Sequence, residues 1–404
     1  MSGPTKKDLQ AAVDAVAQFG NASAAARELG LARKTLTDRV VIAERKGVVS
    51  KYAPKPSAAH VVHDAAIIEF IRSRPRTFEQ IAAKFSLTPA EVAAKCAALA
   101  QQGYNVFASG ATVSIEKRPV PNASGLIADR GLYTWDSDEN GEYKFGVVSD
   151  NHLGSKYARE DVLHDLYDWF ASQGITRVYN AGNWIDGEAR FNKFDLKVHG
   201  MQAQIDYFCA NYPRRPGITT YYVAGDDHEG WYCKDNGVDI GTLAEVTGRE
   251  KFGRDDLRYL GYMESYIALT HRETRKTSQL MVVHPGGGSS YAISYAPQKF
   301  AEALQGGEKP AVIIFGHWHK MDVFNYRNVW LIQAGTTEDQ TPFMRKQKLE
   351  AHVGGLIVSL KQDEKGGIME CTTTQRRYFD RGYHNGSFSM SGPISHPPIK
   401  RKVA

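Results

Sequence analysis

Asp150 and His152 are the first residues of this chain whose types and spacing indicate chemistry. They follow the apolar run at residues 145–148, which reads as a short strand. Two positions apart in an extended chain, a carboxylate and an imidazole lie on the same side, so together they can hold one metal ion. An Asp-x-His pair also occurs by chance in solvated loops. The pair therefore indicates a metal site only if further metal-binding residues occur elsewhere in the chain.

Four more segments with metal-binding side chains follow later apolar runs. They contain Asn183 and Asp186, then Asp226, Asp227 and His228, then His284, and finally His317 and His319. Because the carboxyl ends of neighbouring parallel strands meet at one edge of a sheet, we expect these segments to converge. Five such segments in one chain predict a metal-dependent active site.

The chemistry of two neighbouring divalent cations fits the residue types in these segments. Two cations about 3.5–4 Å apart can share a water, lower its pKa, and stabilise both the attacking and the leaving oxygen at phosphorus. Mixed imidazole and carboxylate ligands favour manganese, with iron and zinc as alternatives, over magnesium and calcium. The four cysteines lie far apart and outside these segments, so a structural zinc site and a disulfide framework are not expected.

The runs between and around the segments alternate between strand and helix, which predicts an α/β domain. Expected strands are 145–148, 177–180, 219–223, 265–269, 280–283, 312–315, 329–333 and 355–360, with helices near 161–172 and 197–211.

Taken in order, the five segments resemble the pattern of the calcineurin-like metallophosphoesterase superfamily: Asp-x-His, Gly-Asp-x-x-Asp, Gly-Asn-His-Asp/Glu, His and Gly-His-x-His. The resemblance covers residues 145 to about 360. It implies a four-layer α/β/β/α sandwich that hydrolyses a phosphoester. It also implies a role for each residue: one metal on Asp150, His152 and His319, a second on Asp227, His284 and His317, Asn183 bridging the metals, and His228 as general acid oriented by Asp186.

Two positions depart from the family pattern. Asn183 stands where the family has a bridging aspartate, and Asp227 stands where it has an asparagine, preceded by an inserted Asp226. An amide oxygen carries no negative charge, so it bridges two cations poorly. Either Asp227 or Asp226 balances the charge of the metals, or one metal site is weak; the sequence leaves these alternatives open.

The basic excess of the chain lies entirely in its first 118 residues. They hold 17 lysines and arginines against 10 acidic residues, a net charge of +7, whereas the remainder has a net charge of −2. Such asymmetry indicates a region that binds a polyanion, most simply nucleic acid.

Within residues 1–50, the spacing of Ala26, Gly30 and Leu36 is that of two helices crossing at a tight turn. This resembles the helix-turn-helix of the Fis-like DNA-binding families. The resemblance implies that the second helix presents five side chains to a major groove and its phosphates: Arg33, Lys34, Thr35, Thr37 and Arg39. A helical hairpin used for dimerisation is the alternative.

Residues 61–118 predict a second small helical domain. Capping boxes begin helices after Thr77 and Thr88, and residues 104–115 alternate as a hairpin. This resembles a winged helix. The helix that would enter a groove has only Lys95 as a basic residue, so DNA reading and partner binding are equal alternatives.

The predicted domain boundaries are 1–50 (helix-turn-helix), 51–60 (linker), 61–118 (winged helix), 119–143 (linker), 144–379 (catalytic domain) and 380–404 (a mobile basic tail). No apolar run is long enough to span a membrane, and no apolar signal core follows the N-terminus. We therefore expect a cytoplasmic protein that does not bind membranes.

These features together predict a metal-dependent DNA nuclease, similar to the repair-nuclease branch of the superfamily and encoded by a phage. The basic region would bring DNA, as single strand or duplex, to the metals. Aromatic residues beside the ligands could stack on unpaired bases, although core packing is the simpler role for each: Trp184, Trp231, Tyr232 and Trp318.

Two alternatives remain open. The chain could be a phosphatase on a protein or small phosphoester, with the N-terminal domains binding a partner protein or a second copy of the chain. It could also be a DNA-binding regulator whose phosphoesterase site is inactive because of Asn183.

Overall fold

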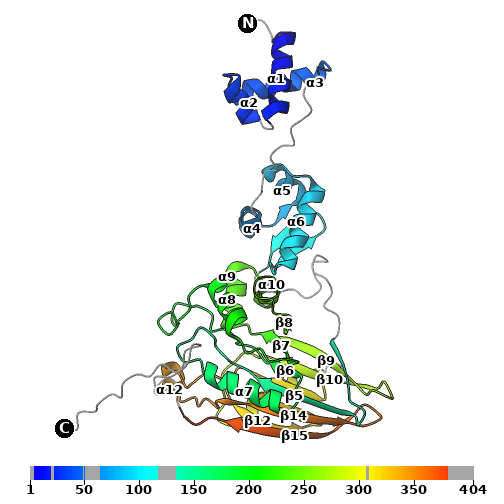
Figure 1. Ribbon diagram of the computed structural model, residues 1–404, viewed down its shortest axis with the longest axis vertical. Coiled ribbons are helices and arrows are strands. Elements are labelled where there is room, and N and C mark those ends of the chain that lie inside the picture. The colour runs from blue at the N-terminus through cyan, green and yellow to red at the C-terminus, as the bar shows by residue number, and fades with distance from the viewer. Residues whose placement is uncertain are drawn as a thin grey trace, which may run out of the picture. The chain divides into compact units, whose positions relative to one another are not determined.

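The computed structural model describes residues 4–19, 22–48, 50, 64–116, 133–305 and 309–380 (Figure 1). The chain divides into two compact units, Met1–Glu69 and Phe70–Ala404, with the boundary inside helix α4 (Asp64–Arg72). The predicted linker at 51–60, most of the linker at 119–143, and all of the predicted tail except Asp380 lie outside the described residues.

In the first unit, α1 (Lys6–Phe19), α2 (Ala22–Glu28) and α3 (Arg33–Arg45) pack around small side chains. The core residues are Ala12, Ala15, Ala25, Ala26 and Leu36. Gly30 has φ of +61°, the left-handed conformation that glycine adopts without strain. The predicted pair of helices and the turn between them are present, and DNA binding by this unit stays a prediction.

The second unit begins with a small region of helices and strands. Its helices are α5 (Phe78–Phe85) and α6 (Pro89–Gln101), and its sheet has the order β1 (Arg76–Thr77), β3 (Thr112–Ile115), β2 (Val106–Ser109). Both predicted capping boxes are present, because the Thr77 and Thr88 hydroxyls accept from the backbone N–H three residues later. The predicted helix starts and hairpin are therefore present, whereas the function of this region is not shown.

The remainder of the second unit contains two six-stranded sheets. The first has the order β15 (Ile368–Arg377), β14 (Gly354–Gln362), β5 (Glu142–Val148), β6 (Arg177–Asn180), β7 (Thr219–Ala224), β8 (Leu257–Tyr262). Strands β5 to β8 are parallel, and β14 and β15 are antiparallel to their neighbours.

The second sheet has the order β12 (Met321–Tyr326), β13 (Val329–Ala334), β11 (Val312–Phe315), β10 (Thr277–Val283), β9 (Glu264–Thr270), β4 (Tyr133–Asp136). Its central strands β10, β11 and β13 are parallel.

The two sheets pack face to face, and helices cover their outer faces. Phe145 and Leu356 of the first sheet share a core with Leu280 and Ile314 of the second. The helices on the first sheet are α7 (Glu160–Ser172), α8 (Met201–Asn211), α9 (Glu229–Asn236) and α10 (Ile240–Phe252); α11 (Tyr295–Ala303) packs on the second. The predicted four-layer α/β/β/α fold is confirmed.

Strand β5 shows why the central strands read as continuous apolar runs. Phe145 and Val147 lie in the core between the sheets, whereas Val148 packs with the helices on the other side. A strand that is covered on both faces has no solvent-facing positions to fill with polar residues. Gly146 lies so close to α7 that an added Cβ would approach Phe170 to 2.9 Å.

Every strand predicted for the sandwich is present. The described strands of the sandwich that the sequence did not predict are β4, β8, β12 and β15, which are the edge strands of the two sheets. Among the described residues, no helix is both long and apolar enough to cross a membrane.

Candidate metal centre

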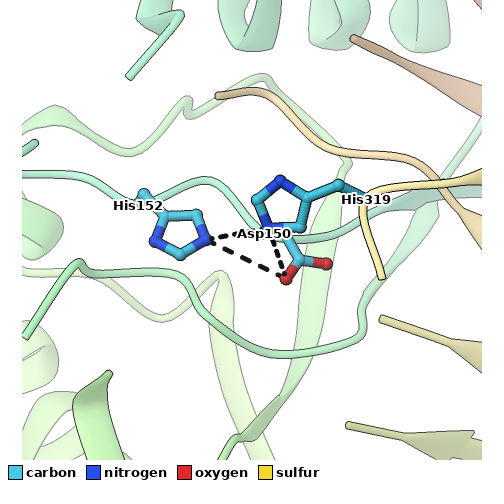
Figure 2. A group of neighbouring side chains, drawn as sticks. All are labelled: Asp150, His152 and His319. Carbon is cyan, nitrogen blue, oxygen red and sulfur yellow. Dashed lines mark hydrogen bonds and ion pairs between the residues drawn. The ribbon is translucent and has the colours of Figure 1, made fainter. Parts of the chain in front are cut away.

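The first predicted ligand group comes together at the ends of β5 and β11. The Nε2 atom of His319 lies 3.3 Å from Asp150 Oδ1 and 3.3 Å from His152 Nε2, and His152 Nε2 lies 3.9 Å from Asp150 Oδ1 (Figure 2). Ligand atoms that each lie about 2.1 Å from one cation have separations of this size. All three residues are buried. The three atoms can therefore hold one metal ion.

The second predicted group is formed by Asp227, His284 and His317. Asp227 places Oδ1 3.3 Å from His284 Nε2 and Oδ2 3.3 Å from His317 Nδ1. The outer ring nitrogens are held by backbone carbonyls, with His284 Nδ1 2.6 Å from Ala181 O and His317 Nε2 2.6 Å from Gly287 O. Such contacts fix the rings of metal-binding histidines.

Several polar atoms of the second group and of the neighbouring Asn183 have no hydrogen-bond partner. They are His284 Nε2, Asp227 Oδ1 and Asn183 Oδ1, each of them buried. A buried polar atom without a partner is costly, and a bound cation would satisfy all three atoms. The donor set therefore fits divalent cations that take oxygen and imidazole ligands.

Asn183 contacts both groups. Its carbonyl oxygen accepts from the backbone N–H of His152 at 2.9 Å. Its side chain lies by Gly225, where an added Cβ would stand 2.7 Å from Asn183 Oδ1 and 3.0 Å from Asp227 Oδ1. Only glycine leaves room there for the side chains of the second group.

Asp226 and Asp227 point to different partners. Asp226 accepts hydrogen bonds from Lys234 Nζ at 2.9 Å and from the hydroxyl of Tyr262. Asp227 instead faces His284 and His317. Of the two, the geometry therefore favours Asp227 as the residue that offers a carboxylate to a metal.

Asp186 lies between His152 and His228. Its Oδ1 is 2.8 Å from His152 Nδ1 and 3.3 Å from His228 Nδ1, and its carbonyl oxygen is 2.8 Å from His228 Nδ1. Asp186 thus contacts the predicted general acid as expected, and it also fixes the ring of a predicted ligand. The indole of Trp231 stacks on His228 with ring centroids 4.7 Å apart.

Electrostatics give the two histidines beside Asp186 different charge states. Burial lowers the pKa of His152 to about 4, so this ring is neutral and can offer Nε2 to a metal. Burial also acts to lower the pKa of His228, but the hydrogen bond and charge of Asp186 outweigh it and raise the pKa to about 10. His228 therefore carries a proton at neutral pH.

The residues at the strand ends have strained backbones. Positive φ values between 47° and 78° occur at Asp150, His152, Asn183, His228, His317 and His319. A non-glycine residue in this conformation costs about 1–3 kcal/mol, and such residues cluster at functional sites. The surrounding fold holds these side chains in place against that cost.

Seven of the predicted site residues line one cavity of about 640 Å³, whereas Asp150 and His284 are not part of its lining. His152, Asn183, Asp186, Asp227, His228, His317 and His319 all line it. The space is large enough for a nucleotide-sized group.

Most of the predicted stacking residues are core residues. Trp184 and Tyr232 are 0% and 6% exposed and pack between the first sheet and its helices. Trp318 is 9% exposed and packs in the outer core of the second sheet, although it also lines the cavity. Core packing is thus the role of Trp184 and Tyr232, and Trp231 stacks on His228.

Sequence reasoning missed several residues that line this cavity, and three of them bear on its chemistry. Glu338 is buried, with Oε2 3.8 Å from His152 Nε2 and Oε1 accepting from the Ser155 hydroxyl at 3.0 Å. It follows β13, so the strand-end rule that found the other segments also applies to it. Phe191 and Phe343 are the other two, and their sequence context gave no metal-ligand signal.

The predicted DNA-contacting residues lie on α3 of the first unit. Arg33, Lys34 and Thr35 are exposed. The Thr37 hydroxyl donates to Arg33 O at 2.9 Å, and Arg39 forms an ion pair with Asp8 at 3.7 Å. Arg33 and Lys34 are therefore the cations of this set best placed to meet a phosphate.

No protein-family model and no curated protein sequence matches the chain. Solved structures do. An archaeal phosphodiesterase is 13% identical, with 58% of this chain and 100% of that chain covered and a TM-score of 0.30. Vacuolar protein sorting 29 from Cryptosporidium parvum is 10% identical, with 59% of this chain and 99% of that chain covered and a TM-score of 0.30. A 5′-nucleotidase precursor from Thermus thermophilus is 13% identical, with 58% of this chain and 54% of that chain covered and a TM-score of 0.30.

Proposed function

We propose that this chain is a metal-dependent phosphodiesterase that hydrolyses DNA. The observation that carries the proposal is the convergence of two Asp/His groups and a protonated histidine on one cavity. Structural sites hold a metal in a closed set of ligands, whereas a catalytic site opens onto space for a substrate. This site opens onto a cavity.

Each side chain has a role in this proposal. Asp150, His152 and His319 would hold one divalent ion, Asp227, His284 and His317 would hold the other, and Asn183 would offer its amide oxygen as a further ligand. Manganese suits this mixture of ligands, with iron and zinc as alternatives. When bound, the ions activate a water and neutralise charge on the phosphoryl oxygens.

His228 delivers the proton that the leaving group needs. Its Nδ1 faces Asp186, which leaves Nε2 as the nitrogen that can donate. As the oxygen of the attacking water bonds to phosphorus, the bond from phosphorus to the leaving oxygen breaks, and that oxygen takes the proton from Nε2. Asp186 stabilises the protonated ring before the transfer and keeps it oriented.

The choice of DNA rests on the charge of the chain. The first 118 residues carry a net charge of +7, and α3 presents Arg33 and Lys34 to solvent. Cations on an exposed helix attract a polyphosphate backbone irrespective of its sequence.

The test compares substrates with one preparation of the full chain and manganese. Single-stranded, linear duplex and circular DNA are incubated beside a generic phosphodiester and a phosphomonoester. We expect cleavage of DNA and of the phosphodiester, abolished by a chelator and restored by manganese. Turnover of the monoester without DNA cleavage would favour a phosphatase. No turnover of any substrate, with DNA still retarded on a gel, would favour a DNA-binding regulator.

A further inference from the structure

Two large aromatic side chains stand exposed at the cavity that contains the metal centre. Phe191 is 72% exposed and Phe343 is 63% exposed, and both line the cavity. We call the two segments that carry them, residues 190–194 and 343–348, the rim. An exposed apolar surface beside a polar cavity marks a place where a ligand binds.

The first segment of the rim is tied to the site. The Asn192 side chain, next to Phe191, is buried and donates to Asp186 Oδ2 at 3.2 Å. The Phe191 ring packs edge-on against Trp231, with centroids 5.3 Å apart. Because Trp231 stacks on His228 in turn, a continuous series of rings leads from the proposed general acid to the surface.

The second segment is α12 (Pro342–Lys346) and the residues that follow it. Thr341 caps the helix by accepting from the Met344 N–H at 3.1 Å, and the Met344 side chain is buried. These two contacts anchor the helix while the adjacent Phe343 remains exposed to the cavity.

Basic side chains accompany the aromatic ones in both segments. All are exposed: Arg190 and Lys193 in the first, and Arg345, Lys346 and Lys348 in the second. Apart from the residues of the metal centre and their partners, Asp195 is the acidic residue that lines the same cavity. The rim therefore combines flat apolar faces with positive charge.

We propose that the rim binds an unpaired nucleic-acid strand, with bases stacked on Phe191 and Phe343 and phosphates beside the five cations. Stacking platforms between basic side chains are how proteins hold single strands without reading their sequence. A duplex hides the faces of its bases inside the stack, so it cannot use the two rings. The inference rests on the proposed function and narrows its substrate to a single strand that crosses the rim.

The experiment measures the affinity of the full chain for a labelled single-stranded oligonucleotide by fluorescence anisotropy. A chelator prevents cleavage, and excess unlabelled duplex occupies any duplex-binding region. Phe191→Ala and Phe343→Ala should each weaken binding by about fivefold to a hundredfold. Phe191→Trp should restore the affinity. Phe194→Ala is the matched control, because Phe194 is 85% exposed in the same segment but does not line the cavity.

An abasic strand of the same length separates stacking from charge. The wild-type chain should bind it more weakly than the normal strand, whereas the double variant Phe191→Ala/Phe343→Ala should bind both strands equally. Equal wild-type affinity for the two strands, or an equal loss with Phe194→Ala, would overturn the inference. Unchanged melting temperatures show that the variants fold, as expected for exposed side chains.

The same preparations separate this inference from the proposed function. Ring-dependent binding without cleavage of any phosphodiester in manganese would leave the inference standing and remove the function. Cleavage of DNA, together with unchanged affinity of Phe191→Ala/Phe343→Ala for the single strand, would support the proposed function and overturn the inference.

Discussion

The distribution of charge at the proposed metal centre depends on which of two positions, 183 or 227, holds a carboxylate. The amide of Asn183 and the carboxylate of Asp227 both lie at the second ligand group, and Gly225 leaves space for both. In the superfamily pattern that the sequence resembles, the aspartate and the asparagine occupy the opposite positions. In the proposed site the total ligand charge therefore equals that of the pattern, and the negative charge lies beside His284 and His317 instead of at position 183.

Asp227→Asn should lower the affinity for manganese by at least about tenfold, because the second group loses its carboxylate. Titration calorimetry of the full chain measures this. The double variant Asn183→Asp/Asp227→Asn returns the charge to the site and should recover most of the affinity.

Asp226→Asn is the matched control for that titration. Asp226 is held by Lys234 and Tyr262, so its loss should leave the metal affinity unchanged. A loss as large as that of Asp227→Asn would show that the assignment of the carboxylate is wrong.

His228→Ala should slow hydrolysis of a phosphodiester by at least about a hundredfold, because the leaving oxygen then departs without a proton. Metal affinity should stay unchanged, since His228 is not among the proposed ligands. Steady-state rates with saturating manganese measure the effect. His199→Ala provides the comparison, because that histidine is 51% exposed and lies outside the cavity. Retained activity in His228→Ala would refute its role as general acid.

At the level of elements, the site is built from the turns in which strands end. The proposed ligands Asp150, His152, Asn183, His317 and His319 have positive φ, and glycines fill positions where chain segments touch. Gly187 is one of these. An added Cβ there would lie 2.1 Å from the carbonyl oxygen of His228.

Gly187→Ala should therefore displace His228 and reduce activity by at least about tenfold. Its φ of +64° adds a loss of stability of about 1 kcal/mol. Gly217→Ala is the matched control, because Gly217 has φ of +79° but no atom within 4 Å of the added Cβ. Thermal unfolding should show a loss of stability in both variants, larger in Gly187→Ala because its Cβ also meets the His228 backbone, and hydrolysis rates should fall only in Gly187→Ala. Equal hydrolysis rates in Gly187→Ala and Gly217→Ala would contradict the close contact between Gly187 and His228.

For the whole molecule, charge is divided between the proposed tasks. The first unit has exposed cations on α3, whereas the second unit holds the acidic and imidazole side chains of the metal centre. In the proposed function, the first unit raises the local concentration of DNA and the second unit cleaves it. Binding and hydrolysis should then respond to different substitutions.

Arg33→Ala/Lys34→Ala should weaken binding of duplex DNA and reduce the slope of log affinity against log salt by up to about 1.8, the value for two phosphate contacts. Hydrolysis of a small phosphodiester should not change. Lys6→Ala/Lys7→Ala removes the same charge from exposed positions on α1 and should have a smaller effect. Equal effects of the two pairs would show that α3 has no special part in binding.

The central strands, and the candidate ligands that the structure brings together, could be predicted from the sequence. Strands such as β5 and β11 are covered on both faces, so their residues form uninterrupted apolar runs, and a proposed ligand follows each of these two runs. The edge strands β4, β12 and β15 were not predicted, because much of their surface is exposed and their sequences lack such apolar runs.

Tertiary structure alone decided which carboxylates face the cavity. Asp226 and Asp227 are neighbours of the same type, and only the positions of Lys234 and Tyr262 show that Asp226 is engaged elsewhere. The rim likewise joins segments about 150 residues apart, each unremarkable in sequence. Buried strands and strand ends can be recognised from local sequence patterns, because each is formed by residues that are close together in the chain. The meeting of distant side chains depends on how the whole chain packs.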